Sequence, residues 1–349
     1  MAYTTINKSS LHFNTKTYTG TGSSNAITGV GFQPDWIWIK NRSSSSNHHL
    51  VDAVRGITKE LRSNLTNTEA TDDQLITAFG SDGFTVGTSG SGNPNNENVV
   101  AWNWKANGQG SSNTDGGINT TYTSANTTSG FSIVTWTGTG SASSIGHGLG
   151  VKPSMVILKS TSNGYGWYTW HKGLSSEMNK YVRLDTTGSV ATDTSAFGST
   201  APTTTVFPIG TGNSGTNVSG HTYVAYCFAE KTGFSKFGSY RGNGSTDGTF
   251  VYTGFKPAFV MTKYASGGGT GSWHMYDNKR KGYNTENDYV QANTTSSENS
   301  DTDQVDLLSN GFKWRANGSE TNTSGGVFIY LTFAEAPLVG TNNVAANAK

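Results

Sequence analysis

The segment Gly31-Phe-Gln-Pro-Asp-Trp-Ile-Trp-Ile-Lys40 decides the fold, because this chain contains it in three versions. The other two are Gly150-Val-Lys-Pro-Ser-Met-Val-Ile-Leu-Lys159 and Gly254-Phe-Lys-Pro-Ala-Phe-Val-Met-Thr-Lys263. In each version, glycine permits a turn, and proline fixes φ just before a strand, where no ladder donor is needed. The residues after proline are apolar and β-branched or aromatic, which predicts a strand near the centre of a sheet.

Two further landmarks recur in the same order around this segment. The first is Tyr18-Thr-Gly-Thr-Gly22, with counterparts at Trp136-Thr-Gly-Thr-Gly140 and Tyr240-Arg-Gly-Asn-Gly244. The last is Val99-Val-Ala-Trp-Asn-Trp104, with counterparts at Tyr223-Val-Ala-Tyr-Cys-Phe228 and Phe328-Ile-Tyr-Leu-Thr-Phe333. Three landmarks repeated three times indicate three homologous modules. We place them at residues 1–110, 111–233 and 234–349, the third ending in a small polar tail, residues 340–349.

The closing segment of each module alternates between two kinds of side chain. Val100, Trp102 and Trp104 share one face of the predicted strand, and Ala101 and Asn103 share the other. This pattern predicts a sheet with one packed side and one side of small or polar residues. The expected core therefore combines these large residues with their counterparts and with the large residues of the proline segments: Trp36, Trp38, Met155, Ile157, Tyr226, Phe228, Phe259, Met261, Leu331 and Phe333.

Further short strands are expected between the landmarks, separated by turns rich in Gly, Asn, Ser and Thr. They cover residues 15–18, 48–51 and 83–86 in the first module and 237–240, 273–276 and 311–314 in the third. Residues 54–62 could form one short helical turn. Short strands at this spacing predict an all-β fold of three tandem antiparallel β-sandwich modules of the jelly-roll or lectin-like type.

Composition and charge exclude several classes of protein. Only 13% of the 349 residues are charged and the formal net charge is +1, but the 9 Trp, 15 Tyr and 16 Phe supply enough aromatic mass for folded cores. The balanced charge argues against nucleic acid as a partner. Cys227, the one cysteine, excludes an intrachain disulfide and a cysteine-based metal site. No apolar run has membrane-spanning length and no secretory signal is evident, so we expect a protein made in a reducing compartment.

Motifs that carry chemistry are nearly absent. There is neither a phosphate-binding loop nor a Gly-x-Ser-x-Gly elbow, and we expect no enzyme activity, cofactor or metal. The acidic groups Asp72-Asp73 and Asp301/Asp303/Asp306 could bind calcium or serve glycoside hydrolysis. They stand in polar loops without the calcium-loop frame, which favours solvated loop acids.

Histidine and tryptophan recur at similar places in the repeats and give the candidate site. These residues are His48, Trp167, Trp170, His171, Trp273 and His274. Their rings could stack on sugar faces while nearby polar groups orient a glycan. The alternative is that they are part-buried residues of a repeated strand, and this is the more common outcome for such residues.

Several stretches of the chain together resemble a family of repeat-containing structural proteins of tailed bacteriophages, especially those of aquatic bacteria. The stretches are residues 1–8 and 13–16, Gly29-Val-Gly-Phe-Gln-Pro-Asp-Trp-Ile-Trp-Ile-Lys-Asn-Arg42, Asp52-Ala-Val-Arg-Gly56, Ser81-Asp-Gly-Phe84, residues 228–240, and Phe333-Ala-Glu-Ala-Pro-Leu-Val-Gly-Thr-Asn-Asn343. The resemblance covers essentially the whole chain. It implies a virion protein with lectin-like β modules, and it carries over no functional residue.

The residues and the resemblance together give the functional expectation. It is a non-enzymatic protein displayed on the phage particle as a tail fibre or capsid fibre, contributing to attachment to host-surface polysaccharide. The alternatives are a decoration (cement) protein with a purely structural role and, less favoured, a tailspike-like glycanase. Because small sandwich modules expose edges and faces that the few charges cannot guard, we also expect contacts with other virion proteins and a homotrimer.

Overall fold

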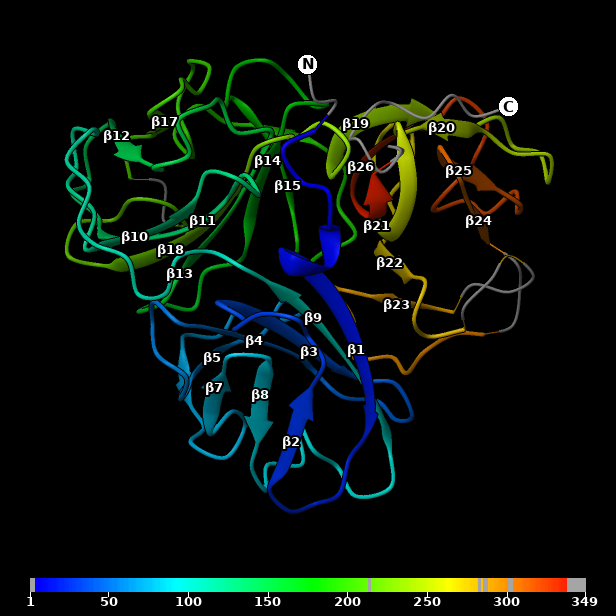
Figure 1. Cartoon of the computed structure of the whole chain (residues 1–349). Coiled ribbons are helices and arrows are strands. Elements are labelled where there is room, and N and C mark those ends of the chain that lie inside the picture. Colours follow the sequence, from blue (N-terminus) through cyan, green and yellow to red (C-terminus); the bar gives the residue numbers. More distant parts are fainter. Residues whose placement is uncertain (1–3, 213–214, 282–283, 285–287, 301–303, 338–349) are drawn as a thin grey trace.

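The computed structural model describes residues 4–212, 215–281, 284, 288–300 and 304–337. In this part of the chain it contains 26 strands and one short 3-10 helix, η1 (Ser9–Leu11). Every pairing between named strands is antiparallel, which confirms the predicted all-β, antiparallel fold. The strands form three lobes arranged as a triangle (Figure 1).

Lobe 1 (residues 13–104) consists of a large and a small sheet. The large sheet has the order β1-β9-β3-β4-β5-β6, with β1 (Phe13–Thr19), β9 (Asn98–Trp104), β3 (Trp36–Asn41), β4 (His48–Asp52), β5 (Lys59–Leu61) and β6 (Ala70–Thr71). The small sheet has the order β2-β8-β7, with β2 (Asn25–Thr28), β8 (Gly83–Val86) and β7 (Ala78–Gly80). Residues 54–62 form turns and strand β5, so the expected helical turn was wrong.

Lobe 2 (residues 122–228) repeats this plan with one additional strand. Its large sheet has the order β10-β11-β18-β13-β14-β15-β16, with β10 (Tyr122–Asn126), β11 (Phe131–Thr137), β18 (Thr222–Phe228), β13 (Met155–Ser160), β14 (Tyr168–His171), β15 (Lys180–Arg183) and β16 (Ala191–Thr192). The small sheet pairs β12 (Ser143–Gly146) with β17 (Val206–Ile209). Strand β10, on the outer edge of β11, has no counterpart in the other two large sheets.

Lobe 3 (residues 235–337) has a large sheet of order β19-β26-β21-β22-β23 and a small sheet of order β20-β25-β24. The large sheet contains β19 (Ser235–Arg241), β26 (Val327–Pro337), β21 (Phe255–Ser266), β22 (Trp273–Asp277) and β23 (Tyr289–Gln291). The small sheet contains β20 (Phe250–Tyr252), β25 (Gly311–Trp314) and β24 (Val305–Leu308). The tail assigned to residues 340–349 lies outside the described residues.

The repeated sequence landmarks occupy equivalent places in the three large sheets. The proline segment forms the strand beside the closing segment, and its first large residue pairs with the last residue of that segment: Trp36 with Trp104, Met155 with Phe228, and Phe259 with Phe333. The module boundaries placed after residues 110 and 233 fall in the two connections between the lobes, residues 105–121 and 229–234.

Each lobe has its own hydrophobic cluster between its large and small sheets. In lobe 1, Ile27 and Phe84 of the small sheet pack with Ile37, Ile39 and Ala101 of the large sheet. Lobes 2 and 3 have corresponding clusters. These clusters contain the face of the closing strand that we expected to be small, polar and unpacked.

The other faces of the three large sheets meet in a fourth cluster, which all three lobes share. Its members include Trp36, Trp38, Trp102, Trp104, Phe131, Ile157, Tyr226, Phe228, Phe237, Phe259, Met261, Leu331 and Phe333. The predicted burial of the large residues is therefore confirmed, with none more than 3% exposed. The expectation of only one packed side was wrong, because the face expected to be unpacked is covered by the small sheet of the same lobe, while the large residues on the other face pack against the neighbouring lobes.

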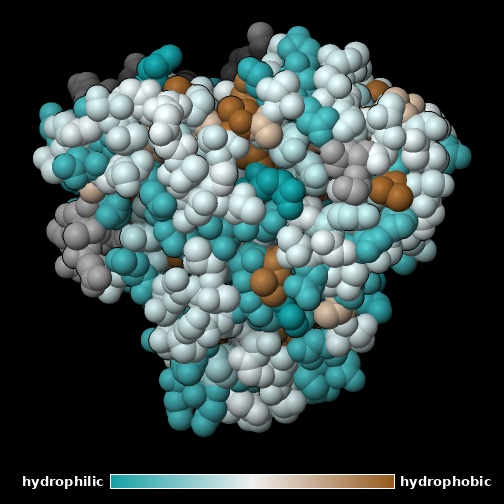
Figure 2. Space-filling model, turned by 180° about the vertical axis from the view of Figure 1, so that it is seen from behind, coloured by the Kyte–Doolittle hydropathy of each residue, from teal (hydrophilic) through white to brown (hydrophobic). Residues whose placement is uncertain are grey.

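Aromatic rings from different lobes contact one another directly in the shared cluster. The ring of Trp36 stacks on that of Tyr226 with centroids 4.3 Å apart, and Phe13 stacks on Phe333 at 4.8 Å. Surface colouring agrees with this inward concentration of apolar groups, since the back of the molecule is mostly hydrophilic or neutral with small, separate hydrophobic spots (Figure 2). The lobes therefore share this central core, in addition to the cluster that each lobe has between its own two sheets.

Candidate functional site

The six residues predicted to bind glycan are all buried. His274 is the most accessible at 4% exposed, and the other five are at most 1% exposed. A ring that stacks on a sugar must present an open face, and these side chains have none. The structure gives them packing and hydrogen-bonding roles between and within the lobes, so we do not carry the glycan-binding assignment of these residues further.

Three of the six form a ring of hydrogen bonds around the junctions between lobes. His48 Nε2 lies 3.0 Å from the Gln291 carbonyl of lobe 3. Trp273 Nε1 of lobe 3 donates to the Arg183 carbonyl of lobe 2 at 2.8 Å, and Trp167 Nε1 of lobe 2 donates to the Arg62 carbonyl of lobe 1 at 2.9 Å. These donors stand at corresponding places, at the start of β4 and β22 and just before β14.

A second ring of contacts involves the residue that pairs with the first large residue of each proline segment. In lobes 1 and 3 this residue is an aspartate: Asp52 accepts from Tyr226 Oη at 2.8 Å, and Asp277 accepts from Trp102 Nε1 at 3.0 Å. In lobe 2 it is His171, whose Nε2 lies 3.0 Å from the Tyr330 carbonyl of lobe 3. Each contact joins one lobe to the next, so the ring closes.

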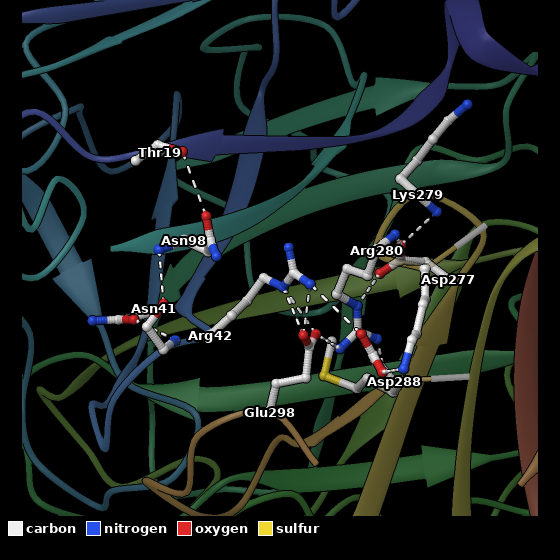
Figure 3. Close-up of polar contacts among 12 residues, drawn as sticks. Thr19, Asn41, Arg42, Asn98, Asp277, Lys279, Arg280, Asp288 and Glu298 are labelled. Carbon is white, nitrogen blue, oxygen red and sulfur yellow. Dashed lines mark hydrogen bonds and ion pairs between the residues drawn. The ribbon is translucent and has the colours of Figure 1, made fainter. Parts of the chain in front are cut away.

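The two aspartates belong to two separate buried ionic networks, and lobe 2 has no ion pair at the corresponding places. Asp277 pairs with Arg280, Nε to Oδ2 at 2.8 Å, and Arg280 also reaches Glu298 at 2.9 Å. Arg42 of lobe 1 binds the same Glu298 carboxylate at 2.6 Å (Figure 3). The Asp52–Arg55 pair in lobe 1 repeats the Asp277–Arg280 geometry at 2.6 Å. Lobe 2 has His171 and, three residues later, Leu174 at these places.

Three buried lysines end the proline segments. Lys40, Lys159 and Lys263 have no exposed surface, and backbone carbonyls accept from their ammonium groups. Lys40 and Lys263 reach carbonyls of a neighbouring lobe, at Thr295 and Thr187. Burial lowers the pKa of Lys159 to about 7 and the pKa values of Lys40 and Lys263 to about 8.

The remaining predicted residues also have partners. Trp170 packs in the lobe 2 cluster and its Nε1 donates to the Glu177 carbonyl at 3.0 Å. The ring of His274 lies 4.9 Å from that of Tyr289, and burial lowers the pKa of His274 to about 4. Of the six, Trp170 alone lines one of the pockets described below.

A groove can form at each of the three junctions between lobes. Two of these three grooves are filled by other parts of the chain. At the lobe 1–2 groove, the Asp35 carboxylate accepts from the amides of Ala106 and Gly108, at 2.7 and 3.1 Å, and strand β10 covers the edge of β11. At the lobe 3–1 groove, helix η1 contacts β1 and β26, and a space of about 50 Å³ remains beside Ser10.

The lobe 2–3 groove is open, and it is our candidate site. It has a volume of about 560 Å³ and is lined by Lys152, Pro153, Ser154, Trp170, Lys172, Gly173, Ser176, Gly238 and Ser239. The connection before lobe 3, residues 229–234, is much shorter than the one before lobe 2 and leaves the groove unfilled. Sequence analysis missed the groove, although the length of this connection was a usable signal.

Charges around this groove are nearly balanced, with an excess of one positive charge. Lys172 and Lys236 both bind Glu230, at 2.6 and 2.8 Å. Hydrogen bonds from Ser176 and the Glu177 amide, together with the charge of Lys152, lower the pKa of Glu177. Glycine is required in the wall, because a Cβ on Gly238 would lie 2.7 Å from Tyr330 Oη.

The acidic residues and the cysteine singled out from the sequence have structural surroundings in the described part of the chain. No set of three or more His, Cys, Asp or Glu side chains there could hold a metal ion. Asp72 binds the Gln74 amide and the Ser89 hydroxyl, and Asp306 binds Arg315, whereas Asp301 and Asp303 lie outside the described residues. Burial raises the pKa of Cys227 to about 12. Among the described residues, no helix has the length and apolarity needed to span a membrane.

An outward-facing aromatic pair distinguishes lobe 3. Phe250 and Tyr252 are 44% and 61% exposed and share the outer face of strand β20, with buried Val251 between them. Ile27 of lobe 1 and Ile145 of lobe 2 correspond to Val251, and their neighbours are Ala26 and Thr28, and Ser144 and Gly146. The other two lobes therefore carry only small side chains at this place.

The fold and the groove define a class: an all-β, three-lobed protein with a shared aromatic core and a polar groove between two lobes. A family model described as a domain of unknown function (DUF7483) matches residues 8–337. The chain therefore belongs to this family. A search of curated proteins finds no match.

Proposed function

We propose that the chain is a non-enzymatic structural protein on the surface of a bacteriophage particle, as a tail fibre or capsid fibre, and that it contributes to attachment to host polysaccharide. The observation that carries this proposal is the shared core, which joins three homologous lobes into one closed unit. The buried aromatic rings and ion pairs in it hold the lobes together. Such a unit suits display and contact better than it suits catalysis.

The outward aromatic pair supports the attachment part of the proposal. Phe250 and Tyr252 have open faces, and Lys313 lies directly across from Phe250 in the sheet. Lys313 binds Asp247 at 2.5 Å, so polar groups stand beside the rings. Exposed rings next to hydrogen-bonding groups suit a saccharide, whose C–H faces stack on aromatic surfaces while its hydroxyls are hydrogen-bonded.

Labelling of intact particles tests the proposed location. An antibody raised against the purified chain is applied to particles of the phage that encodes it, followed by electron microscopy. Label on tail or head fibres is the expected result. Dense label over the whole head would favour the alternative, a decoration protein. Particles that contain none of this chain by mass spectrometry would overturn the proposal.

Binding to host surfaces tests the attachment part. The purified chain is incubated with host cells and with cells whose surface polysaccharide has been removed. We expect retention by the first and loss of retention with the second, and a weaker retention of the Phe250→Ala/Tyr252→Thr variant. Equal retention by both cell types would contradict a polysaccharide receptor.

A further inference from the structure

We propose that the lobe 2–3 groove accepts an extended segment of another polypeptide, which adds as a strand to the free edge of β19. The inference does not depend on glycan attachment. It starts from a difference between equivalent strands: β11 of lobe 2 has β10 on its outer edge, whereas β19 of lobe 3 is an edge strand. Strand addition to an exposed sheet edge is a common mode of peptide recognition.

The register of the sheets identifies the open position on β19. Thr135 of β11 pairs with Val224, and Ser239 of β19 pairs with Ile329, the residue that corresponds to Val224. The Thr135 carbonyl accepts from the amide of Thr121, which directly precedes β10, at 2.7 Å. Ser239 therefore directs its backbone toward the place where β10 lies in lobe 2, and Ser239 is exposed and lines the groove.

The connection before lobe 3 covers only the start of this edge. The Ser235 amide donates to the Lys231 carbonyl at 2.9 Å, and the Phe237 amide donates to the Glu230 carboxylate at 3.3 Å. Beyond these two positions the groove begins. Its volume of about 560 Å³ lies within the range of about 300–1,000 Å³ typical of ligand sites.

The lining defines what the added segment would be. The lining includes Gly173, Gly238 and Pro153, whose small or absent side chains leave room for small side chains of the added segment, as in the Thr-Ser-Ala stretch of β10. The excess of one positive charge, with Lys152 and Lys172 at the rim, favours a neutral or acidic segment over a basic one. On a particle, such a segment would come from a neighbouring virion protein.

The chain's own strand β10 supplies the probe. A fluorescent peptide with the sequence of residues 119–127, Asn-Thr-Thr-Tyr-Thr-Ser-Ala-Asn-Thr, is titrated with the full chain and followed by fluorescence anisotropy. The Thr123 amide bonds the Ser111 carbonyl on the far side of β10, so the backbone of the next residue, Ser124, faces β11. We expect saturable binding, and a loss of about tenfold or more when Ser in the sixth position of the peptide, which corresponds to Ser124, is replaced by proline, because this removes a strand hydrogen bond.

Variants of the protein locate the site. Ser239→Pro removes the edge amide and should weaken peptide binding about tenfold or more. Ser176→Trp, at the exposed rim, should block the groove without touching the backbone of β19, and it keeps the test valid if the proline variant fails to fold. The matched control is Thr17→Pro in β1, the counterpart of Ser239 beside the filled groove, which should bind the peptide as the wild type does.

Three outcomes would overturn the proposal. One is the absence of peptide binding at millimolar concentration. Another is unchanged binding in Ser176→Trp together with a loss in Thr17→Pro, which would place the peptide elsewhere. A third is a groove that binds oligogalacturonate or maltotetraose, with loss in Ser176→Trp, and ignores the peptide, which would make it a saccharide site. None of these outcomes bears on where the chain lies on the particle, so failure here is distinct from failure of the proposed function.

Discussion

The junctions between lobes solve the same packing problem in two chemically different ways. Lobes 1 and 3 use a buried aspartate–arginine pair, Asp52–Arg55 and Asp277–Arg280, to meet the next lobe. Lobe 2 uses neutral His171 and Leu174 at the same places. The difference teaches that the geometry of the junction is set by the sheets and the shared aromatic core, and that the ionic pair is one of several groups that can occupy it.

Breaking one ionic pair should have the largest effect. Arg280→Met leaves the Asp277 carboxylate buried without its cation, and we expect a loss of about 3–5 kcal/mol in the free energy of unfolding, measured by urea denaturation. The exposed neighbour provides the control, since Lys279→Met should change little. The double variant Asp277→His/Arg280→Leu, which copies lobe 2, should recover at least half of the loss. If Arg280→Met denatures at the same urea concentration as the wild type, the ionic pair contributes nothing to the stability of the protein.

Acid should weaken the neutral junction next. Burial lowers the pKa of His171 to about 3 in the folded protein, against about 6.5 in the unfolded chain, so the unfolded chain takes up a proton first as the pH falls. The stability that depends on neutral His171 is complete above pH 6.5 and decreases between pH 6.5 and about 3, by about 1.4 kcal/mol per pH unit. His171→Gln should reduce the slope of the free energy of unfolding against pH by the amount that corresponds to one proton. Urea titrations at a series of pH values measure this slope. An unchanged slope would show that His171 is not buried neutral.

The three lysines predict a further increase of stability with rising pH, at neutral to alkaline pH. The pKa of Lys159 is about 7 in the folded protein and about 10.4 when unfolded, so the folded state releases its proton first and stability rises from about pH 7 upward. Measurements between pH 7 and 9.5 avoid tyrosine ionisation in the unfolded chain. Lys159→Met should lower the slope of stability against pH, and Lys40→Met should lower it only above about pH 8. Identical slopes in all three proteins would contradict the assignment.

The smallest effect on stability is expected at the outward aromatic pair. Phe250→Ala/Tyr252→Thr gives lobe 3 the residues that lobe 1 carries at this place, and both side chains are exposed. The free energy of unfolding should therefore change by less than about 0.5 kcal/mol, the range of an ordinary surface substitution, and the melting temperature should change little. A large decrease in differential scanning calorimetry would mean that the pair stabilises the fold and is not held for an external contact.

Sequence patterns predicted the strands well because turns and alternation are local. The glycine and proline signals placed strands at residues 83–86 and 311–314 with the bounds that the structure has. The same patterns could not show what covers the second face of a sheet. The run Trp36-Ile-Trp-Ile39 was apolar on both faces, which is typical of a strand buried on both sides, and we interpreted only one face of it.

The candidate site could not be predicted from the sequence, for a different reason. Trp167 and Trp273 looked like exposed binding residues, because burial by another lobe leaves no mark on the residues near them in the chain. The groove itself depends on which segment fills each junction, a property of two lobes and a connection together. The apolar faces that led us to expect a homotrimer are covered within one chain. A homotrimer would therefore have to form through another surface, such as the edge of β19.

Closure of the three-lobed ring has a consequence for how the protein is made. Arg42 binds Glu298, 256 residues later, so this contact cannot form until nearly the whole chain has left the ribosome. During synthesis, the aromatic faces of lobes 1 and 2 stay uncovered until lobe 3 has been made. This takes about half a minute or less at ordinary elongation rates of about 5–20 residues per second. Long-range contacts of this kind slow folding. A cell that makes this protein must therefore guard two unfinished hydrophobic surfaces until the third lobe arrives.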